Sequence, residues 1–325
     1  MRQTAIFIAA AVAIIPLAAL IGRATDDLAH RLGGGMGAFL NATFGNAAEL
    51  IIGLFALRRG LTDLVKASLT GSIIGNVLLV FGLCALVGGL KHPVQRFNRT
   101  AASMGATMLL LSAIGLTVPA IFHELSRGGQ SLELKVDTDI AIVLFLTYVA
   151  SLVFTLKTHR DLYGHAEHET APRGSVWPAI AMLTAGTAGV AWMSELLVDG
   201  VADAAGALGM SNLFVGVVVV AIVGNAAEHY SAVVMAARNK MDVAIGIAVG
   251  SSAQIALFVA PVLVFASYFI GPAPMDLRFS VFEVVAVAIS VFTISMIAHD
   301  GETHWMEGVQ LLAVYAILVI GFYFL

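Results

Sequence analysis

Two glutamates of this 325-residue chain lie inside apolar runs. Glu49 is followed directly by the apolar residues 50–57, and Glu228 comes after the apolar run 214–223. A carboxylate at membrane depth is costly unless it is protonated, paired or bound to a cation. Two such carboxylates, if brought together, balance either one divalent cation or two protons. The residue types therefore favour chemistry in which a cation and protons compete for the same pair.

Both glutamates end the same five-residue motif. Gly45-Asn46-Ala47-Ala48-Glu49 recurs letter for letter as Gly224-Asn225-Ala226-Ala227-Glu228, which places the second motif 179 residues after the first. The same offset carries Gly71-Ser72 onto Gly250-Ser251. A second match in the same register indicates an internal repeat rather than a chance match in an alanine-rich chain.

Oxygen-bearing neighbours accompany each glutamate. Asn46 and Asn225 lie three residues before them, on the same helical face. Ca2+ takes six to eight oxygens from carboxylates, amides and carbonyls, so further candidates are Ser72, Asn76, Ser251, Ser252, Gln254 and the backbone carbonyls of Ala42 and Ala221. His229 follows Glu228 and could relay protons or be a satisfied core histidine. For the small polar residues, helix packing is an equally good interpretation.

The elements that must position these residues are membrane helices. The chain is 59% hydrophobic and 12% charged, about half the charged fraction of a soluble domain. Apolar runs long enough to span a bilayer predict ten helices near residues 3–22, 36–57, 63–90, 100–123, 136–157, 176–198, 211–237, 241–270, 279–298 and 304–325. The predicted fold is an all-α membrane protein in contact with the lipid bilayer.

Parity sets the relation between the halves. The two motifs lie on spans 2 and 7, and an odd number of crossings reverses direction through the bilayer. We therefore expect two inverted five-helix repeats, 1–158 and 176–325, joined by a central cytoplasmic loop at 159–175. Inverted repeats around a midplane site are typical of secondary transporters.

The charged residues outside the motifs give weaker signals. Lys and Arg are more numerous on the side of the central loop, which the positive-inside rule assigns to the cytoplasm, with both termini outside. Asp26, Asp27, Glu195 and Asp199 are expected at solvated helix ends, and Glu283 about one turn into its span. No basic patch indicates nucleic acid, and a single cysteine, Cys84, excludes an intramolecular disulfide.

The paired motifs, together with Gly250-Ser251-Ser252-Ala253-Gln254-Ile255-Ala256-Leu257-Phe258, resemble the calcium/proton antiporter (CAX) family of the cation/calcium exchanger superfamily. The resemblance extends over essentially the whole chain. It implies exchange of Ca2+ for H+, with Glu49 and Glu228 as the shared site for both ions. It also implies that Asn46 and Asn225 support them, and that Ser251 and Gln254 belong to the adjacent helix of the site.

Other functions remain open at this point. A sodium- or potassium-coupled exchanger is the nearest alternative, and selectivity among Ca2+, Mn2+, Na+ and K+ is not readable. A cation channel would need a continuous pore. The sequence has neither an H-E-x-x-H zinc motif nor a convincing serine-nucleophile motif, so we expect no enzyme activity. We also expect no cofactor, with Ca2+ as transported substrate. A prokaryotic source would place the chain in the plasma (inner) membrane, and a homo-oligomer is compatible with the sequence.

Overall fold

The computed structural model describes residues 2–32, 40, 43–126, 129–159 and 175–325. The helical segments of the first half are α1 (Arg2–Leu32), α3 (Ala47–Arg58), α4 (Thr62–Ile74), η1 (Gly75–Val80), α5 (Phe81–Lys91), α6 (Arg99–Leu125), α7 (Gln130–Val153) and η2 (Phe154–Thr158). Those of the second half are α8 (Trp177–Leu208), α9 (Asn212–Phe214), η4 (Val215–Val220), α10 (Ala221–Ala237), α11 (Met241–Gln254), η5 (Ile255–Val259), α12 (Ala260–Ser267), α13 (Val281–Ile297) and α14 (Trp305–Phe324). Two short strands, β1 (Gln95–Arg96) and β2 (Glu302–Thr303), pair antiparallel.

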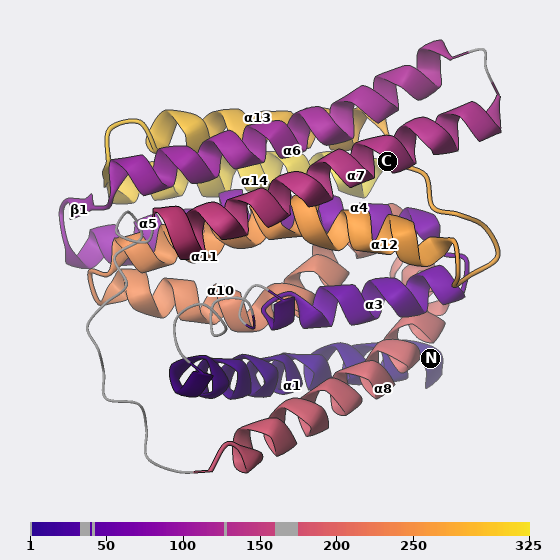
Figure 1. Cartoon of the computed structure of the whole chain (residues 1–325), viewed down its shortest axis with the longest axis horizontal. Coiled ribbons are helices and arrows are strands. Elements are labelled where there is room, and N and C mark those ends of the chain that lie inside the picture. The colour runs from indigo at the N-terminus through magenta and orange to yellow at the C-terminus, as the bar shows by residue number, and fades with distance from the viewer. Residues whose placement is uncertain (1, 33–39, 41–42, 127–128, 160–174) are drawn as a thin grey trace.

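The expected all-α membrane architecture is confirmed. Within the described ranges, eight continuous helical segments are long and apolar enough to cross a membrane, and α13 is a shorter apolar helix. The remaining predicted span, 36–57, corresponds to α3 and the helical residues just before it. Both termini lie at the same end of the helices (Figure 1), as an even number of crossings requires.

Two helices are longer than predicted. α1 continues to Leu32 and α8 to Leu208, about ten residues beyond the expected ends, so the acids expected at solvated helix ends lie within helices. The extension of α1 is stabilised locally, because Arg31 pairs with Asp27 one turn earlier at 2.9 Å. The predicted ends came too early because both extensions contain charged residues, and a search for apolar runs stops where these begin.

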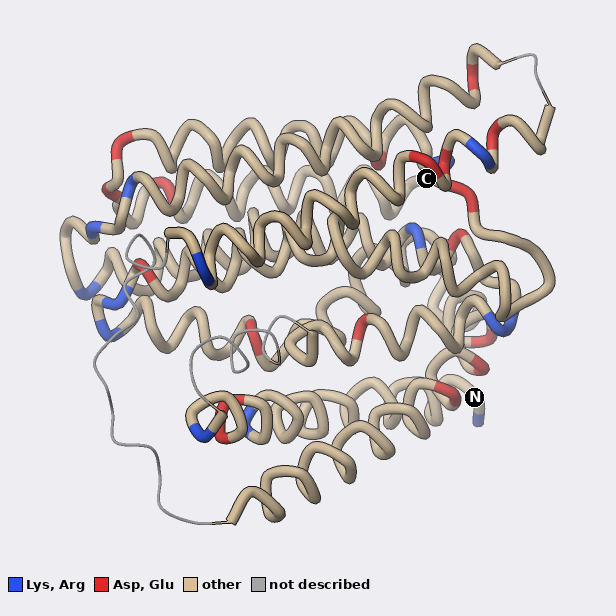
Figure 2. The backbone as a smooth tube through the Cα atoms, in the orientation of Figure 1, with Lys and Arg blue, Asp and Glu red and all other residues tan. Residues whose placement is uncertain are grey.

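The helices form stacked rows when viewed from the side (Figure 1). α6, α13 and α14 lie along one edge, α4, α5, α7, α11 and α12 follow, then α3 and α10 form a row, and α1 and α8 cover the other edge. Figure 2 shows Lys, Arg, Asp and Glu gathered mainly at the two ends of the helices, with acidic positions also within the row of α3 and α10.

The inverted repeat is visible in the packing. α3 packs on α8, and their repeat equivalents α10 and α1 also pack together. α1 and α8 run antiparallel, since Gly186 approaches Ile21 whereas Gly200 approaches Phe7. Ser252 donates a hydrogen bond of 3.5 Å to the carbonyl of Ile73, its own repeat equivalent 179 residues away. Contact between equivalent positions marks the pseudo-twofold axis.

The π-helical turns η1 and η5 also occupy equivalent positions, 75–80 and 255–259. η1 begins shortly after Ser72 and contains Asn76, and η5 follows directly after Gln254. Such turns add one residue to a helical turn and are frequent at functional sites. They therefore change the helical register of the two central helices at equivalent positions of both repeats.

Candidate functional site

The two motif glutamates are carried by α3 and α10. In the first repeat the chain makes a turn at Gly45-Asn46, and α3 begins at Ala47 with Asn46 as its N-cap residue. In the second repeat the same letters continue an unbroken α10. The break that glycine allows is therefore present in only one of the two motifs.

Glu49 lies against the opposite motif. A side-chain carbon added to Gly224 would stand 3.1 Å from Glu49 Oε1 and 3.3 Å from its Cγ. The glycine that opens the second motif thus leaves the space that the first glutamate occupies. Any larger residue at 224 would press on the Glu49 carboxyl group.

The two carboxyl groups are close enough for their charges to interact. Ser251 lies within hydrogen-bonding reach of Glu228. Among the described residues, neither Glu49 Oε2 nor Glu228 Oε2 has a hydrogen-bond partner, although both atoms are buried. Two interacting carboxyl groups, each with a buried oxygen that has no donor, need protons or a cation.

The asparagines of the two motifs make equivalent hydrogen bonds. Ser251 Oγ donates to Asn46 Oδ1 at 3.2 Å, and Asn225 Nδ2 donates to Ser72 Oγ at 2.9 Å. Ser251 and Ser72 are themselves repeat equivalents. Each motif is therefore tied to the central helix of the other repeat, and all four side chains are buried.

Three further predicted residues join this network without a counterpart in the other repeat. Asn46 Nδ2 donates to Gln254 Oε1 at 2.6 Å. Asn76 Nδ2 donates to Ser251 Oγ at 3.3 Å and to Asn225 Oδ1 at 3.4 Å. His229 Nε2 contacts Asn76 Oδ1 at 2.9 Å. Because an amide oxygen only accepts, the histidine nitrogen carries the hydrogen in this contact.

The remaining predicted residues differ in their outcomes. Ser252 is fully buried and donates to the backbone carbonyls of Ala248 and Ile73. Its hydroxyl therefore bonds to helix backbone in this structure and not to the other site side chains. The Ala221 carbonyl lies in the site and accepts a hydrogen bond of 2.9 Å from Asn225 Nδ2. Ala42 lies outside the described residues.

The sequence did not predict a close helix crossing that lies next to the site. A side-chain carbon at Gly71 would lie within van der Waals overlap of the Val217 carbonyl oxygen. Gly71 thus allows α4 to cross η4 in direct contact just before Ala221. The sequence signal was Gly71-Ser72, which marked the repeat but did not identify the partner.

The chemistry available is that of two acids among neutral oxygens. No group of three or more His, Cys, Asp or Glu side chains able to hold a metal occurs in the parts of the chain that the structure describes. Any ion held here must therefore draw its other ligands from amides, hydroxyls and carbonyls. These are the oxygen types that Ca2+ accepts.

Comparison with known proteins assigns the family. The model of the sodium/calcium exchanger protein family matches residues 2–157 and 178–324. The chain is 48% identical to the Bacillus subtilis "Ca(2+)/H(+) antiporter ChaA", covering 97% of this chain and 90% of the relative. It is 43% identical to the "Ca(2+)/H(+) antiporter" of Synechocystis, covering 99% and 91%.

A solved structure of native YfkE agrees with the fold. It superposes with a TM-score of 0.85 at 45% sequence identity, over 98% of this chain and 92% of that one. The predicted resemblance is thereby confirmed. Ten helices in two inverted repeats, a matched pair of motif glutamates and a family match over both halves lead to one conclusion: the chain belongs to the sodium/calcium exchanger protein family.

Proposed function

We propose that this chain is a secondary active transporter that exchanges Ca2+ for H+ by alternating access. Relatives that share more than 40% of its residues over nearly its whole length are named Ca2+/H+ antiporters. In this proposal Glu49 and Glu228 are the shared site, loaded either with one divalent cation or with protons. The protein acts as a carrier and not as an enzyme, and requires no resident cofactor.

The observation that carries the proposal is the pair of buried carboxylate oxygens without a hydrogen-bond donor in the described structure, Glu49 Oε2 and Glu228 Oε2. A cation binding between the carboxylates removes their mutual repulsion. Two protons remove it equally well. With either load, the site can change the membrane face to which it opens without net charge on the glutamates. The empty site would carry two uncompensated charges.

The amide network explains how the site distinguishes its two loads. In this structure Asn46 bonds to Gln254 and Ser251, and Asn225 bonds to Ser72 and Asn76. Ca2+ requires more oxygens than two carboxylates offer. We propose that Asn46, Asn225, Ser72 and Ser251 turn oxygens toward a bound Ca2+, with the Ala221 and Ala42 carbonyls as further ligands.

Alternating access follows from the inverted repeats. Because the halves are structural copies of opposite orientation, exchanging their conformations moves the opening of the site from one membrane face to the other. The chain is an integral multi-pass membrane protein. We place it in the plasma membrane if its source is prokaryotic, surrounded by lipid and compatible with a homo-oligomer.

The test is ion flux in proteoliposomes. An imposed pH gradient should drive Ca2+ uptake, and a protonophore that collapses the gradient should abolish it. Na+ and K+ gradients of equal size, at equal pH on both sides, serve as matched arms. Ca2+ uptake driven by Na+ or K+ but not by protons would assign the alternative coupling and refute the proposal.

A further inference from the structure

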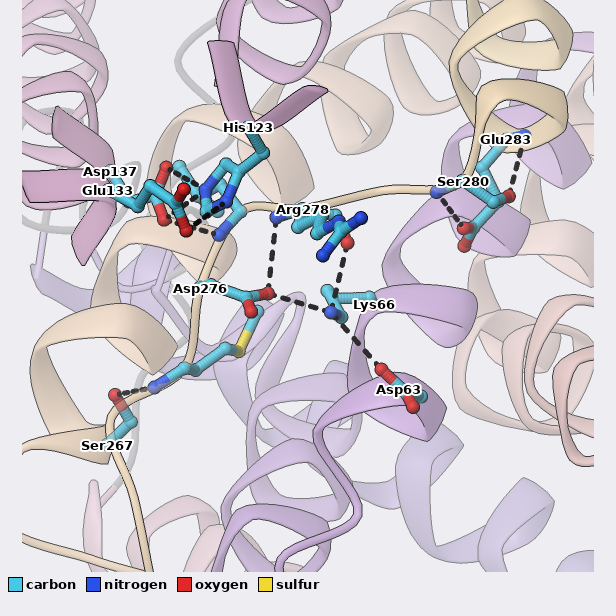
Figure 3. Close-up of polar contacts among 12 residues, drawn as sticks. Asp63, Lys66, His123, Glu133, Asp137, Ser267, Asp276, Arg278, Ser280 and Glu283 are labelled. Atoms are coloured by element: carbon cyan, nitrogen blue, oxygen red, sulfur yellow. Dashed lines mark hydrogen bonds and ion pairs between the residues drawn. The ribbon is translucent and has the colours of Figure 1, made fainter. Parts of the chain in front are cut away.

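A second cluster of titratable groups lies on α6 and α7, helices that carry neither motif glutamate. It consists of His123 near the end of α6 and Glu133 and Asp137 near the start of α7 (Figure 3). His123 Nε2 stands 2.9 Å from Asp137 Oδ2, and His123 Nδ1 stands 3.2 Å from Glu133 Oε2. Both ring nitrogens therefore face carboxylate oxygens.

This geometry fixes a proton count. A neutral imidazole carries one N–H, so one of its nitrogens presents a lone pair. Facing that lone pair with an ionised carboxylate is repulsive, and little water is present to screen it. The side chains of His123 and Asp137 are only 3% and 1% exposed, and that of Glu133 is 22% exposed. The contacts are satisfied when the three groups together hold one proton more than a neutral histidine and two carboxylates.

We propose that His123, Glu133 and Asp137 form a proton-binding site that fastens the connection between α12 and α13. Asp137 Oδ2, which meets the histidine, also accepts the backbone N–H of Leu277 at 3.2 Å. The extra proton keeps Asp137 in place for this hydrogen bond. When the proton leaves to solvent, repulsion within the cluster weakens the attachment of Leu277.

The same connection is held by other charges. Asp276 accepts from Lys66 Nζ at 2.8 Å, and Lys66 Nζ also donates to the Arg278 carbonyl at 3.0 Å. The Arg278 side chain pairs with Glu124 at 3.1 Å. Asp63 lies 3.2 Å from Lys66 Nζ. These contacts anchor the segment to α4 and α6, and the cluster adds the attachment to α7.

Other charged groups near the cluster do not supply the missing donor. Asp276 adds negative charge beside Asp137, Lys66 is occupied by two carboxylates and Arg278 by Glu124. Within the described residues, His123 is thus the group that can bring a positive charge between Glu133 and Asp137. Arg127 lies outside the described residues.

Amide hydrogen exchange of the detergent-solubilised full chain tests the proposal. Protection of the Leu277 N–H, corrected for the intrinsic pH dependence of exchange, should fall roughly tenfold from about pH 6 to about pH 9, the size expected for loss of one charge-assisted hydrogen bond. The Phe97 N–H, which donates 2.9 Å to the Gly301 carbonyl in the repeat-equivalent connection, is the internal control and should show no such change.

Glu133→Gln separates the proton site from a merely structural contact. A glutamine amide can donate to His123 Nδ1, so a neutral imidazole satisfies both neighbours and no extra proton is needed. The variant should keep Leu277 protected at about pH 9, within roughly twofold of its value at about pH 6. A wild-type protein whose Leu277 protection ignores pH, or a variant that retains the wild-type loss, would overturn the proposal.

Nitrogen-15 spectra of labelled histidines give a second readout that does not depend on the variant. In the wild-type protein at about pH 7, where an ordinary histidine is mainly neutral, one histidine should show both ring nitrogens protonated or hydrogen-bonded to a protonated carboxyl group. If all histidines show the ordinary neutral pattern, the cluster holds no extra proton.

Discussion

At the centre of the protein each motif asparagine bonds to the equivalent serine of the other repeat, whereas at the two membrane faces the repeats are held together differently. Asn46 is joined to Ser251 and Asn225 to Ser72, in both cases an asparagine of one motif and a serine of the other repeat. These four side chains thus keep the inverted symmetry in residue type and in pairing, although the serine donates in the first bond and the asparagine donates in the second.

The connections at the two faces do not keep it. Residues 92–98 are held by the β1–β2 pair and by Gln95, whose Nε2 donates a hydrogen bond of 2.8 Å to the Ala236 carbonyl. The ion pair of this connection, Arg96–Glu302 at 3.0 Å, is largely exposed. The equivalent connection, 268–280, is held by ion pairs such as Lys66–Asp276 and by the histidine cluster. The two faces therefore differ in chemistry although their backbone roles are equivalent.

A second difference lies at two equivalent helix contacts, the seam between α3 and α8 and the seam between α10 and α1. Arg59, at the end of α3, pairs with Asp199 of α8 at 2.8 Å. Arg238 is the repeat equivalent of Arg59 at the end of α10, and it forms no ion pair with any residue that the structure describes. One seam is therefore bridged and its counterpart is not. A protein that opens to one face at a time holds its two ends in different states, and the unequal seams agree with this.

The largest expected effect comes from the matched glutamates. Glu49→Gln and Glu228→Gln should each lower Ca2+/H+ exchange by about 100-fold or more, because one missing charge leaves a buried divalent ion uncompensated. Flux in proteoliposomes measures this. Glu283→Gln is the matched control, since Glu283 is also a buried carboxyl group but caps α13 through Ser280. Substantial exchange by either motif variant would contradict equal roles.

The bridged seam predicts a reversible block. Arg59→Cys combined with Asp199→Cys, joined by a short thiol crosslinker, should stop most exchange by holding α8 to α3, and a reductant-cleavable linker should restore it. Cys84 is buried and does not compete. Arg278→Cys with Glu124→Cys crosslinks another exposed ion pair, which joins the α12–α13 connection to α6 and involves neither α3 nor α8. This crosslink should leave exchange largely intact. Equal loss of exchange from both crosslinks would contradict a specific requirement for movement between α3 and α8.

Symmetry at the centre predicts matched losses from the asparagines. Asn46→Ala and Asn225→Ala should each reduce exchange about tenfold, within roughly threefold of one another. Each removes one proposed ligand and two hydrogen bonds to the other repeat. Initial rates of Ca2+ uptake give the comparison. An inactive variant paired with one of wild-type rate would show that the symmetric contacts serve different purposes.

The unmatched histidine predicts a smaller effect. His229→Leu installs the residue type found at the equivalent position, Leu50, and removes the donor to Asn76. Loss of one neutral hydrogen bond should reduce exchange about fivefold. His229→Gln keeps a donor and should retain most activity. A His229→Gln rate as low as that of His229→Leu would show that the imidazole acts through something other than this donor.

Much of the centre could be predicted from the sequence, because its signals are local or repeated. An identical five-residue motif and a fixed offset placed Glu49, Glu228 and both asparagines in one site. The turn at Gly45-Asn46 could not be predicted, since the same letters form an unbroken helix in the second repeat. What differs is the surrounding packing, which the motif does not encode.

The cluster at the membrane face escaped prediction for another reason. His123 stood at the expected end of one span, and Glu133 fell in the expected loop between spans. Their approach depends on α6 and α7 extending to Leu125 and back to Gln130. The donor from Leu277 comes from a connection 140 residues away from Asp137, a distance that no local pattern bridges.

Proton release on Ca2+ binding tests the central claim most directly. Calorimetric titration of the purified protein with Ca2+, repeated in buffers of different ionisation heat, counts the protons displaced. If Glu49 and Glu228 are shared, Ca2+ affinity must fall as pH falls, because protons occupy the carboxylates that the cation needs. The wild-type protein should then release up to two protons per Ca2+ bound under mildly acidic conditions, one from each glutamate. Ca2+ binding of unchanged affinity across the same pH range, with no proton released, would contradict the shared site.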